Sequence, residues 1–175
     1  GFIVSLVLVL GIIMNASVNS QQESSFWMDH THKVMAKANA ILAAAIDMET
    51  GMRGFLIAGQ DEFLEPFVSG KTRIADGFDE LKQTVSDNPP QVERLHETQA
   101  IINDWMVNVA EKAIAMRREI RDVPLENQKT MMDMVEYVRL KEGKTYLDSF
   151  REHIATFISV EAELMDICQQ NADQG

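Results

Sequence analysis

The chain has 175 residues and a formal net charge of −11, and its length suits one domain with a hydrophobic core. The acidity and the lack of a basic stripe argue against nucleic acid as a partner, because phosphates require a basic surface. The single cysteine, Cys168, excludes an internal disulfide, and its position on an apolar seam indicates a small core residue.

The chain opens with an uncharged apolar run from Phe2 to Met14. This run is shorter than the roughly 20 residues that cross a bilayer. Because the chain starts at Gly1 inside the run, we interpret residues 1–20 as the C-terminal part of a truncated transmembrane helix; a signal-peptide core is the alternative. No Lys or Arg precedes Lys33, which predicts that residues 21–175 lie outside the cytoplasm, in the periplasm or extracellular space.

A long amphipathic helix is expected over residues 24–57, where bulky apolar residues recur at alternating steps of four and three. A stripe of small residues runs one position behind this bulky seam. Such a stripe lets another backbone come close, so we expect a homodimer contact there. The candidate contact residues are Ala40, Ala44 and Gly51.

The end of this helix carries three further signals. Glu49 and Arg53 have the spacing and order of a helical ion pair. Gly51 and Gly54 each cost about 1 kcal/mol relative to Ala in a helix, and a close helix approach would offset that cost. Gly59 is predicted to end the helix, and Asp61 to cap the next one.

Three more long helices are expected, at residues 61–85, 89–122 and 145–172. Asn88 is predicted to cap the third, with Pro89 at its first position. Its apolar seam is expected to include Val92, Gln99 and Met106. Residues 123–144 are expected to be irregular or to carry a short helix over residues 131–140, with Gly143 as a stop. Short connections make the whole an all-α, up-down-up-down four-helix bundle, whose first helix continues the apolar run.

The candidate chemistry is sparse. No metal-ligand spacing, cofactor motif or nucleophile with a paired base is visible, so neither a cofactor nor an enzymatic activity is expected. Four arginines are expected near the far end of the bundle, together with two helix N-termini that favour anions. They form a candidate site for a small anionic ligand; the alternative is that neighbouring carboxylates neutralise them. These residues are Arg53, Arg117, Arg118 and Arg121.

The segment from Glu49 to Phe67 resembles the signature of the type-three CHASE domain, with Met52 a mild departure from a position that is often polar. The resemblance implies an extracytoplasmic, helical, sensory domain that precedes a histidine-kinase, cyclase or chemotaxis module. It names no common ligand. We interpret the motif residues as structural, and they are Glu49, Thr50, Gly51, Arg53, Gly54, Gly59, Glu62, Phe63, Leu64 and Pro66.

The functional hypothesis is therefore a sensory domain of an inner-membrane receptor, in particular a methyl-accepting chemotaxis protein. It would be a homodimer held by flanking transmembrane helices, and it would respond to a small anion or a periplasmic partner. The sensor of a histidine kinase or of a diguanylate cyclase is the alternative. A structural helical spacer that senses nothing is the alternative from another class.

Overall fold

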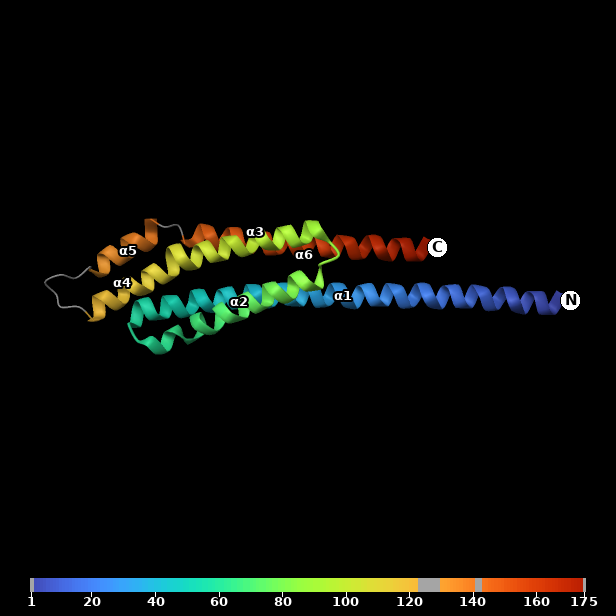
Figure 1. Ribbon diagram of the computed structural model, residues 1–175, viewed down its shortest axis with the longest axis horizontal. Coiled ribbons are helices and arrows are strands. Elements are labelled where there is room, and N and C mark those ends of the chain that lie inside the picture. The colour runs from blue at the N-terminus through green and yellow to red at the C-terminus, as the bar shows by residue number, and fades with distance from the viewer. Residues whose placement is uncertain (1, 123–129, 141–142, 175) are drawn as a thin grey trace. The chain divides into compact units, whose positions relative to one another are not determined.

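The computed structural model describes residues 2–122, 130–140 and 143–174, and these residues form helices joined by short turns (Figure 1). They are organised as two compact units, one comprising residues 37–157 and the other residues 1–36 with 158–175. Side chains are described from residue 26 onward, except at 140, 168 and 171–174, so the core position expected for Cys168 lies outside them.

Four long helical stretches confirm the predicted all-α bundle. Helix α1 runs without a break over Phe2–Ala58, and α2 over Glu65–Thr84 after the 3₁₀ turn η1 at Asp61–Leu64. The third stretch consists of α3 (Pro89–Trp105), the π-helical turn η2 (Met106–Ala110) and α4 (Glu111–Asp122). Helix α6 spans Gly143–Gln174, and the short α5 spans Met131–Leu140 as predicted. All but the outer parts of α1 and α6 belong to the unit of residues 37–157.

The apolar run at the start of α1 was expected to be part of a membrane span. Among the helices of the residues that the structure describes, none combines the length and hydropathy needed to cross a bilayer. The assignment of residues 1–20 to a truncated transmembrane helix stays a prediction.

The core of the unit of residues 37–157 is built from large side chains on every long helix. Aromatic residues fill much of it, and Phe67 of α2 packs against Trp105 of α3 with ring centroids 6.5 Å apart. Burial of such side chains contributes about 1.5–3 kcal/mol each. The largest fully buried side chains here are Ile41, Met48, Phe55, Ile74, Phe78, Leu81, Leu95, Ile102, Trp105, Phe150, Ile154 and Phe157.

Three positions of the predicted seam of the third stretch were wrong by one residue, although Leu95 and Ile102 of the same seam are buried. The buried positions are Gln91, Thr98 and Trp105 rather than the residues that follow each of them. Gln91 donates to the carbonyl oxygen of Phe157 at 3.4 Å, and the Thr98 hydroxyl donates to that of Arg94 at 2.6 Å. These hydrogen bonds offset the desolvation that made polar residues poor core candidates in the sequence.

The turn after α1 confirms one expectation and corrects another. Gly59 ends the helix in the left-handed region, with φ of 72°, where a residue with a Cβ is strained. Asp61 does not cap the following helix, because its carboxylate accepts hydrogen bonds from Arg118 and Arg121 instead. Asn88 does cap α3, accepting from the Gln91 backbone nitrogen at 3.4 Å.

Gly143 was expected to stop the short helix, and this was wrong, because it is the first residue of α6. A Cβ at this position would lie 3.1 Å from Cγ1 of Val109 in η2. Glycine therefore lets the start of α6 pass close to the π-helical turn. The close approach, rather than helix termination, accounts for this glycine.

The stripe of small residues on α1 is covered by α2 of the same chain. A Cβ added to Gly51 would lie 2.9 Å from the Phe63 carbonyl oxygen and from the Phe67 nitrogen, and one added to Gly70 would lie 3.0 Å from the Ala44 carbonyl oxygen. Ala44 and Gly51 are buried, and only Ala40 is exposed. Ala44 and Gly51 thus face α2 of their own chain, and the dimer contact expected at these residues stays a prediction. Homodimer formation itself stays a prediction.

Candidate functional site

Three of the four candidate arginines meet at the turn that follows α1. Helix C-termini leave carbonyl groups without partners, and α4 supplies donors for two of them. Arg117 Nε donates to the Leu56 carbonyl oxygen at 3.0 Å, and Arg121 Nη1 donates to that of Gly59 at 2.9 Å. Arg117 also fills the space beside Gly59, where a Cβ would lie 2.3 Å from its Nη2. These two arginines thus hold the turn in place.

Two carboxylates accept further hydrogen bonds from this arginine cluster. Asp61 Oδ1 accepts from Arg118 Nη2 at 3.1 Å, and Asp61 Oδ2 accepts from Arg121 Nη1 at 2.8 Å. Asp122 accepts two hydrogen bonds from Arg121, at 2.6 and 3.0 Å. The hydrogen bonds from Arg121 and Arg118 hold the pKa of Asp61 below its usual range, and Arg121 lowers the pKa of Asp122.

The apolar side of the cluster is the Phe55 ring. The guanidinium carbons of Arg118 and Arg121 lie 5.7 and 5.9 Å from its centroid. This is the distance range of cation–π attraction, which adds to the ion pairs with Asp61. The arrangement explains why an aromatic residue at the end of α1 and two arginines of α4 occur together.

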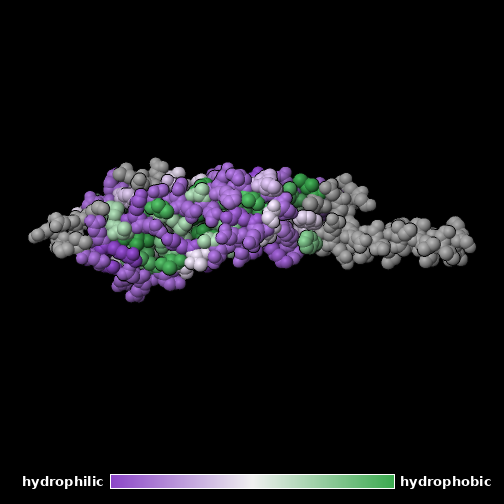
Figure 2. Space-filling view, viewed as in Figure 1, coloured by the Kyte–Doolittle hydropathy of each residue, from purple (hydrophilic) through white to green (hydrophobic). Residues whose placement is uncertain are grey.

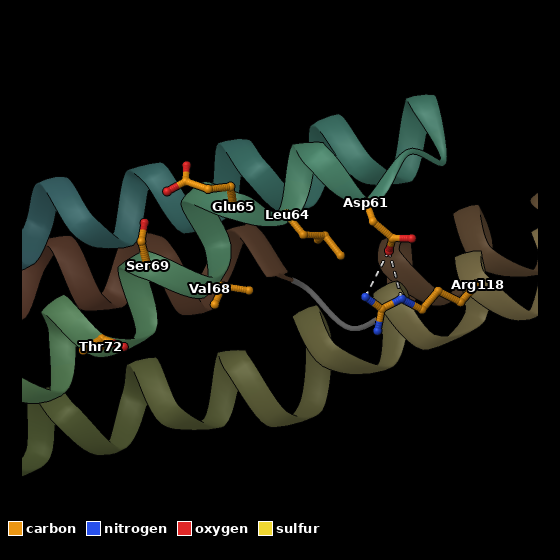
Figure 3. Close-up of a pocket in the computed structure, with 7 residues that line it drawn as sticks. All are labelled: Asp61, Leu64, Glu65, Val68, Ser69, Thr72 and Arg118. Carbon is orange, nitrogen blue, oxygen red and sulfur yellow. Dashed lines mark hydrogen bonds and ion pairs between the residues drawn. The ribbon is translucent and has the colours of Figure 1, made fainter.

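A surface groove of about 570 Å³ opens beside this cluster (Figure 3). In Figure 3, Asp61 and Arg118 face each other across the groove, joined by hydrogen bonds, while the other lining side chains come from η1 and α2. The lining holds two carboxylates and one guanidinium, so it disfavours an anion. Its residues are Asp61, Leu64, Glu65, Val68, Ser69, Thr72 and Arg118.

Arg53 is not part of the arginine cluster. Its Nη2 pairs with Glu49 Oε1 at 2.7 Å, which confirms the expected spacing. Glu49 Oε2 also pairs with Arg151 of α6 at 3.1 Å, and the Glu49 side chain is only 12% exposed. One buried carboxylate thus joins α1 to α6 across 102 residues of sequence.

Arg53 instead lines a second groove, of about 450 Å³, between the end of α1 and α5. The other lining residues in the part of the chain that the structure describes are all apolar. From α1 come Leu56 and Ile57, and from α5 come Met131, Met134, Val135 and Val138. The structure therefore divides the four predicted site residues between two places, three at the turn and one at this groove.

The motif residues have mainly structural positions. Gly51 and Gly54 bring η1 against α1, since a Cβ at Gly54 would lie 2.8 Å from Cδ1 of Phe63. Leu64 is buried, and Pro66 lies in the first turn of α2, while Thr50 and Glu62 are exposed. Most of the motif thus builds the packed turn between α1 and α2.

Sequence reasoning missed the groove beside α5 and the partner of Glu49. Nothing in the sequence indicated that Arg151, far along the chain, would share that carboxylate. The apolar side chains on α5 gave the only signal for the groove, because Met131 and Val135 are more apolar than a solvated surface helix requires. As for metals, the part of the chain that the structure describes holds no group of three or more ligand-type side chains.

The packed bundle and its contacts agree with a helical sensory domain of a signalling receptor. Residues 24–171 match the CHASE3 domain, so the chain belongs to the CHASE3 family of extracytoplasmic sensory domains. This family is sensory rather than catalytic, and its membership confirms the resemblance seen between residues 49 and 67.

Among solved structures, the chain is similar to the sensor domain of the Rhodopseudomonas palustris histidine kinase HK9. The two share 23% sequence identity with a TM-score of 0.51, over 78% of this chain and 95% of that one. At this identity the likeness bears on the fold alone. No curated protein matches the sequence.

Proposed function

We propose that the chain is the ligand-sensing domain of a membrane-anchored, homodimeric methyl-accepting chemotaxis receptor. The CHASE3 match supports the sensory role, and the predicted transmembrane helix at residues 1–20 supports the anchoring. A histidine kinase is the second candidate, because the similar solved structure comes from a kinase receptor.

The observation that carries the proposal is the link between α1 and α6. These helices hold the two ends of the chain, and both continue from the unit of residues 37–157 into the other unit. Within the first unit, Glu49 of α1 pairs with Arg151 of α6. A ligand that changes this contact would shift one helix along the other by about 1–2 Å, a typical displacement at helix interfaces.

A long helix is a suitable carrier for such a shift. Intrahelical hydrogen bonds make an α-helix stiff along its axis, and α1 is unbroken over 57 residues. A displacement at Glu49 is therefore transmitted toward Phe2 without a hinge to absorb it. A ligand moves the equilibrium only by its difference in affinity for the two packings.

The test is to assay the intact receptor in native membranes for three outputs. A chemotaxis receptor is expected to change its glutamate methylation and the activity of a separate kinase when attractant is added. A histidine kinase would instead incorporate phosphate from ATP into itself, and a cyclase would produce a cyclic dinucleotide.

A matched pair of variants checks the role of the helix link. Arg151→Gln, which removes the cation that pairs with Glu49, is expected to shift the basal output. Arg73→Gln, which removes an exposed pair with Asp47 on α1, is the control. If the receptor output changes neither with any stimulus nor with either substitution, the chain is a structural spacer and the proposal is refuted.

A further inference from the structure

The groove between α1 and α5 leaves large apolar side chains in contact with water. Ile57 is 82% exposed and Val135 is 53% exposed, whereas Met134 at the same groove is 4% exposed. The hydrophilic surface in Figure 2 is interrupted by hydrophobic patches of this kind. The groove volume of about 450 Å³ lies within the range of small-molecule pockets. An apolar ligand body that covers Ile57 and Val135 is stabilised by the surface it removes from water.

The charge around the groove selects the polar end of such a ligand. Among the described residues that line the groove, Arg53 is the one that carries a charge, and its side chain is 66% exposed. Its carboxylate partner, Glu49, is shared with Arg151. Arg151 also pairs with Asp148, which in turn pairs with Lys144. Among the described residues, these connected groups comprise three cations and two carboxylates, so within this part of the network the positive charges outnumber the negative ones by one.

In the part of the chain that the structure describes, the arginine cluster at the turn also holds three cations and two carboxylates, but its donors already point to partners within the turn and its groove is acidic. There the guanidinium groups donate to backbone carbonyls and to Asp61 and Asp122. The groove beside that cluster is lined by two carboxylates, which repel an anion. Arg53 is therefore the candidate arginine with charge to offer a ligand.

We propose that this α1–α5 groove binds a small organic anion with one carboxylate and an apolar body. The carboxylate accepts hydrogen bonds from the Arg53 guanidinium, a geometry that suits two parallel bonds. The apolar body lies along Ile57 and Val135, and the unbranched Met131 adapts to its shape. When Arg53 turns to the ligand, Glu49 is left with Arg151 alone, so binding changes the ion pairs around the contact between α1 and α6. The use of this site in signalling rests on the proposed function.

The binding test is calorimetric titration of the full chain with octanoate. Two matched probes distinguish the contribution of the carboxylate from that of the apolar body. Octylamine has the same apolar body as octanoate with the opposite charge, and acetate has the same charge without that body. Octanoate is expected to bind at one saturable site. Octylamine and acetate are expected to bind at least about tenfold more weakly, a difference of about 1.4 kcal/mol.

Variants locate the site. Arg53→Gln and Ile57→Ser change exposed side chains and are each expected to weaken octanoate binding about tenfold or more, with unchanged circular dichroism. Arg73→Gln and Arg118→Gln are the controls at other ion pairs and are expected to bind octanoate normally. The proposal is overturned if octanoate does not bind, if octylamine binds equally well, or if Arg118→Gln loses binding while Arg53→Gln keeps it.

Two further readouts separate this site from its rivals. If Ile57→Ser turns a dimer into a monomer by light scattering and octanoate does not bind, a second copy covers the groove and the proposal fails. If octanoate binds as expected but leaves the output of the intact receptor unchanged, the binding site is supported and its role in sensing is refuted. If octanoate does not bind but another ligand changes the output of the receptor, the binding site is refuted and the sensory function is supported.

Discussion

Gly51 and Gly54 lie one turn apart in α1, yet an added methyl group meets different atoms at each. At Gly51 the Cβ would contact backbone atoms of Phe63 and Phe67, which move only if η1 and α2 move with them. At Gly54 the nearest atom is the ring edge of Phe63, a side chain that is itself exposed and free to turn. The same residue type thus has a strict packing role at one position and a looser one at the next.

The matched variants Gly51→Ala and Gly54→Ala test this difference. Alanine favours a helix by about 1 kcal/mol over glycine at both positions, but overpacking at Gly51 costs about 1–3 kcal/mol. Gly51→Ala is expected to unfold at a lower urea concentration than Gly54→Ala, and Gly54→Ala at a concentration near that of the native chain. Equal midpoints for the two variants would contradict the close approach at Gly51.

At the scale of elements, the π-helical turn η2 is the part of the third stretch that contacts both α5 and the start of α6. A π turn holds one more residue than an α turn and frees a carbonyl group from its usual partner. The Tyr137 hydroxyl of α5 donates a hydrogen bond to the Asn108 carbonyl oxygen within η2. Burial raises the pKa of Tyr137 above its ordinary value, so the hydroxyl stays a donor at neutral pH. This hydrogen bond and the buried Met134 help to hold α5 against the bundle.

Tyr137→Phe is expected to loosen α5 while leaving the rest of the bundle intact. The lost hydrogen bond contributes about 0.5–1.5 kcal/mol, a large share of the stability of a ten-residue helix. Amide hydrogen exchange over residues 131–140 is expected to speed up, and exchange in α2 to stay unchanged. The exposed Val135→Thr is a control on the same helix. Unchanged protection of α5 in Tyr137→Phe would show that the hydroxyl does not hold it.

At the scale of the whole molecule, ion pairs join segments that are distant in sequence. Asp61 pairs with Arg118 and Arg121 of α4, and Glu49 with Arg151 of α6. Hydrogen bonds from arginine lower the pKa of Asp61, and one from Lys144 lowers that of Asp148. A carboxyl group with a lowered pKa in the folded state binds its proton more readily after unfolding. Its stabilising contribution is therefore present above its ordinary pKa of 3.8 and is lost as the pH falls through the lower folded value.

The double variant Asp61→Asn with Asp148→Asn is expected to show a weaker acid dependence of stability. Its free energy of unfolding should differ most from that of the native chain near neutral pH, and this difference should shrink below pH 3.8. Urea titrations at a series of pH values measure it. Asp76→Asn, at an exposed carboxylate of α2 with no ion pair among the described residues, is the control. A difference that persists unchanged into acid would contradict these ion pairs as its source.

Local patterns were enough to predict the long helices, the end of α1 at Gly59 and the Asn88 cap of α3. The repeat from Trp27 to Phe55 predicted α1, and Asn88 with Pro89 predicted the start of α3. The segment from Glu49 to Phe67 pointed to the family that the match over residues 24–171 confirms. These features depend on neighbours within a few residues, so they can be read from spacing.

Only the tertiary structure decided how these elements use their polar groups and small faces. Asp61 was expected to cap a helix, but α4 brings two arginines that compete for its carboxylate. The small stripe on α1 was expected to meet another subunit, but α2 covers it. Arg53 was grouped with the arginines of α4, but the groove with α5 separates it from them. Each outcome depends on which distant segment arrives at a given face, and a helical repeat specifies the face without specifying the segment that covers it.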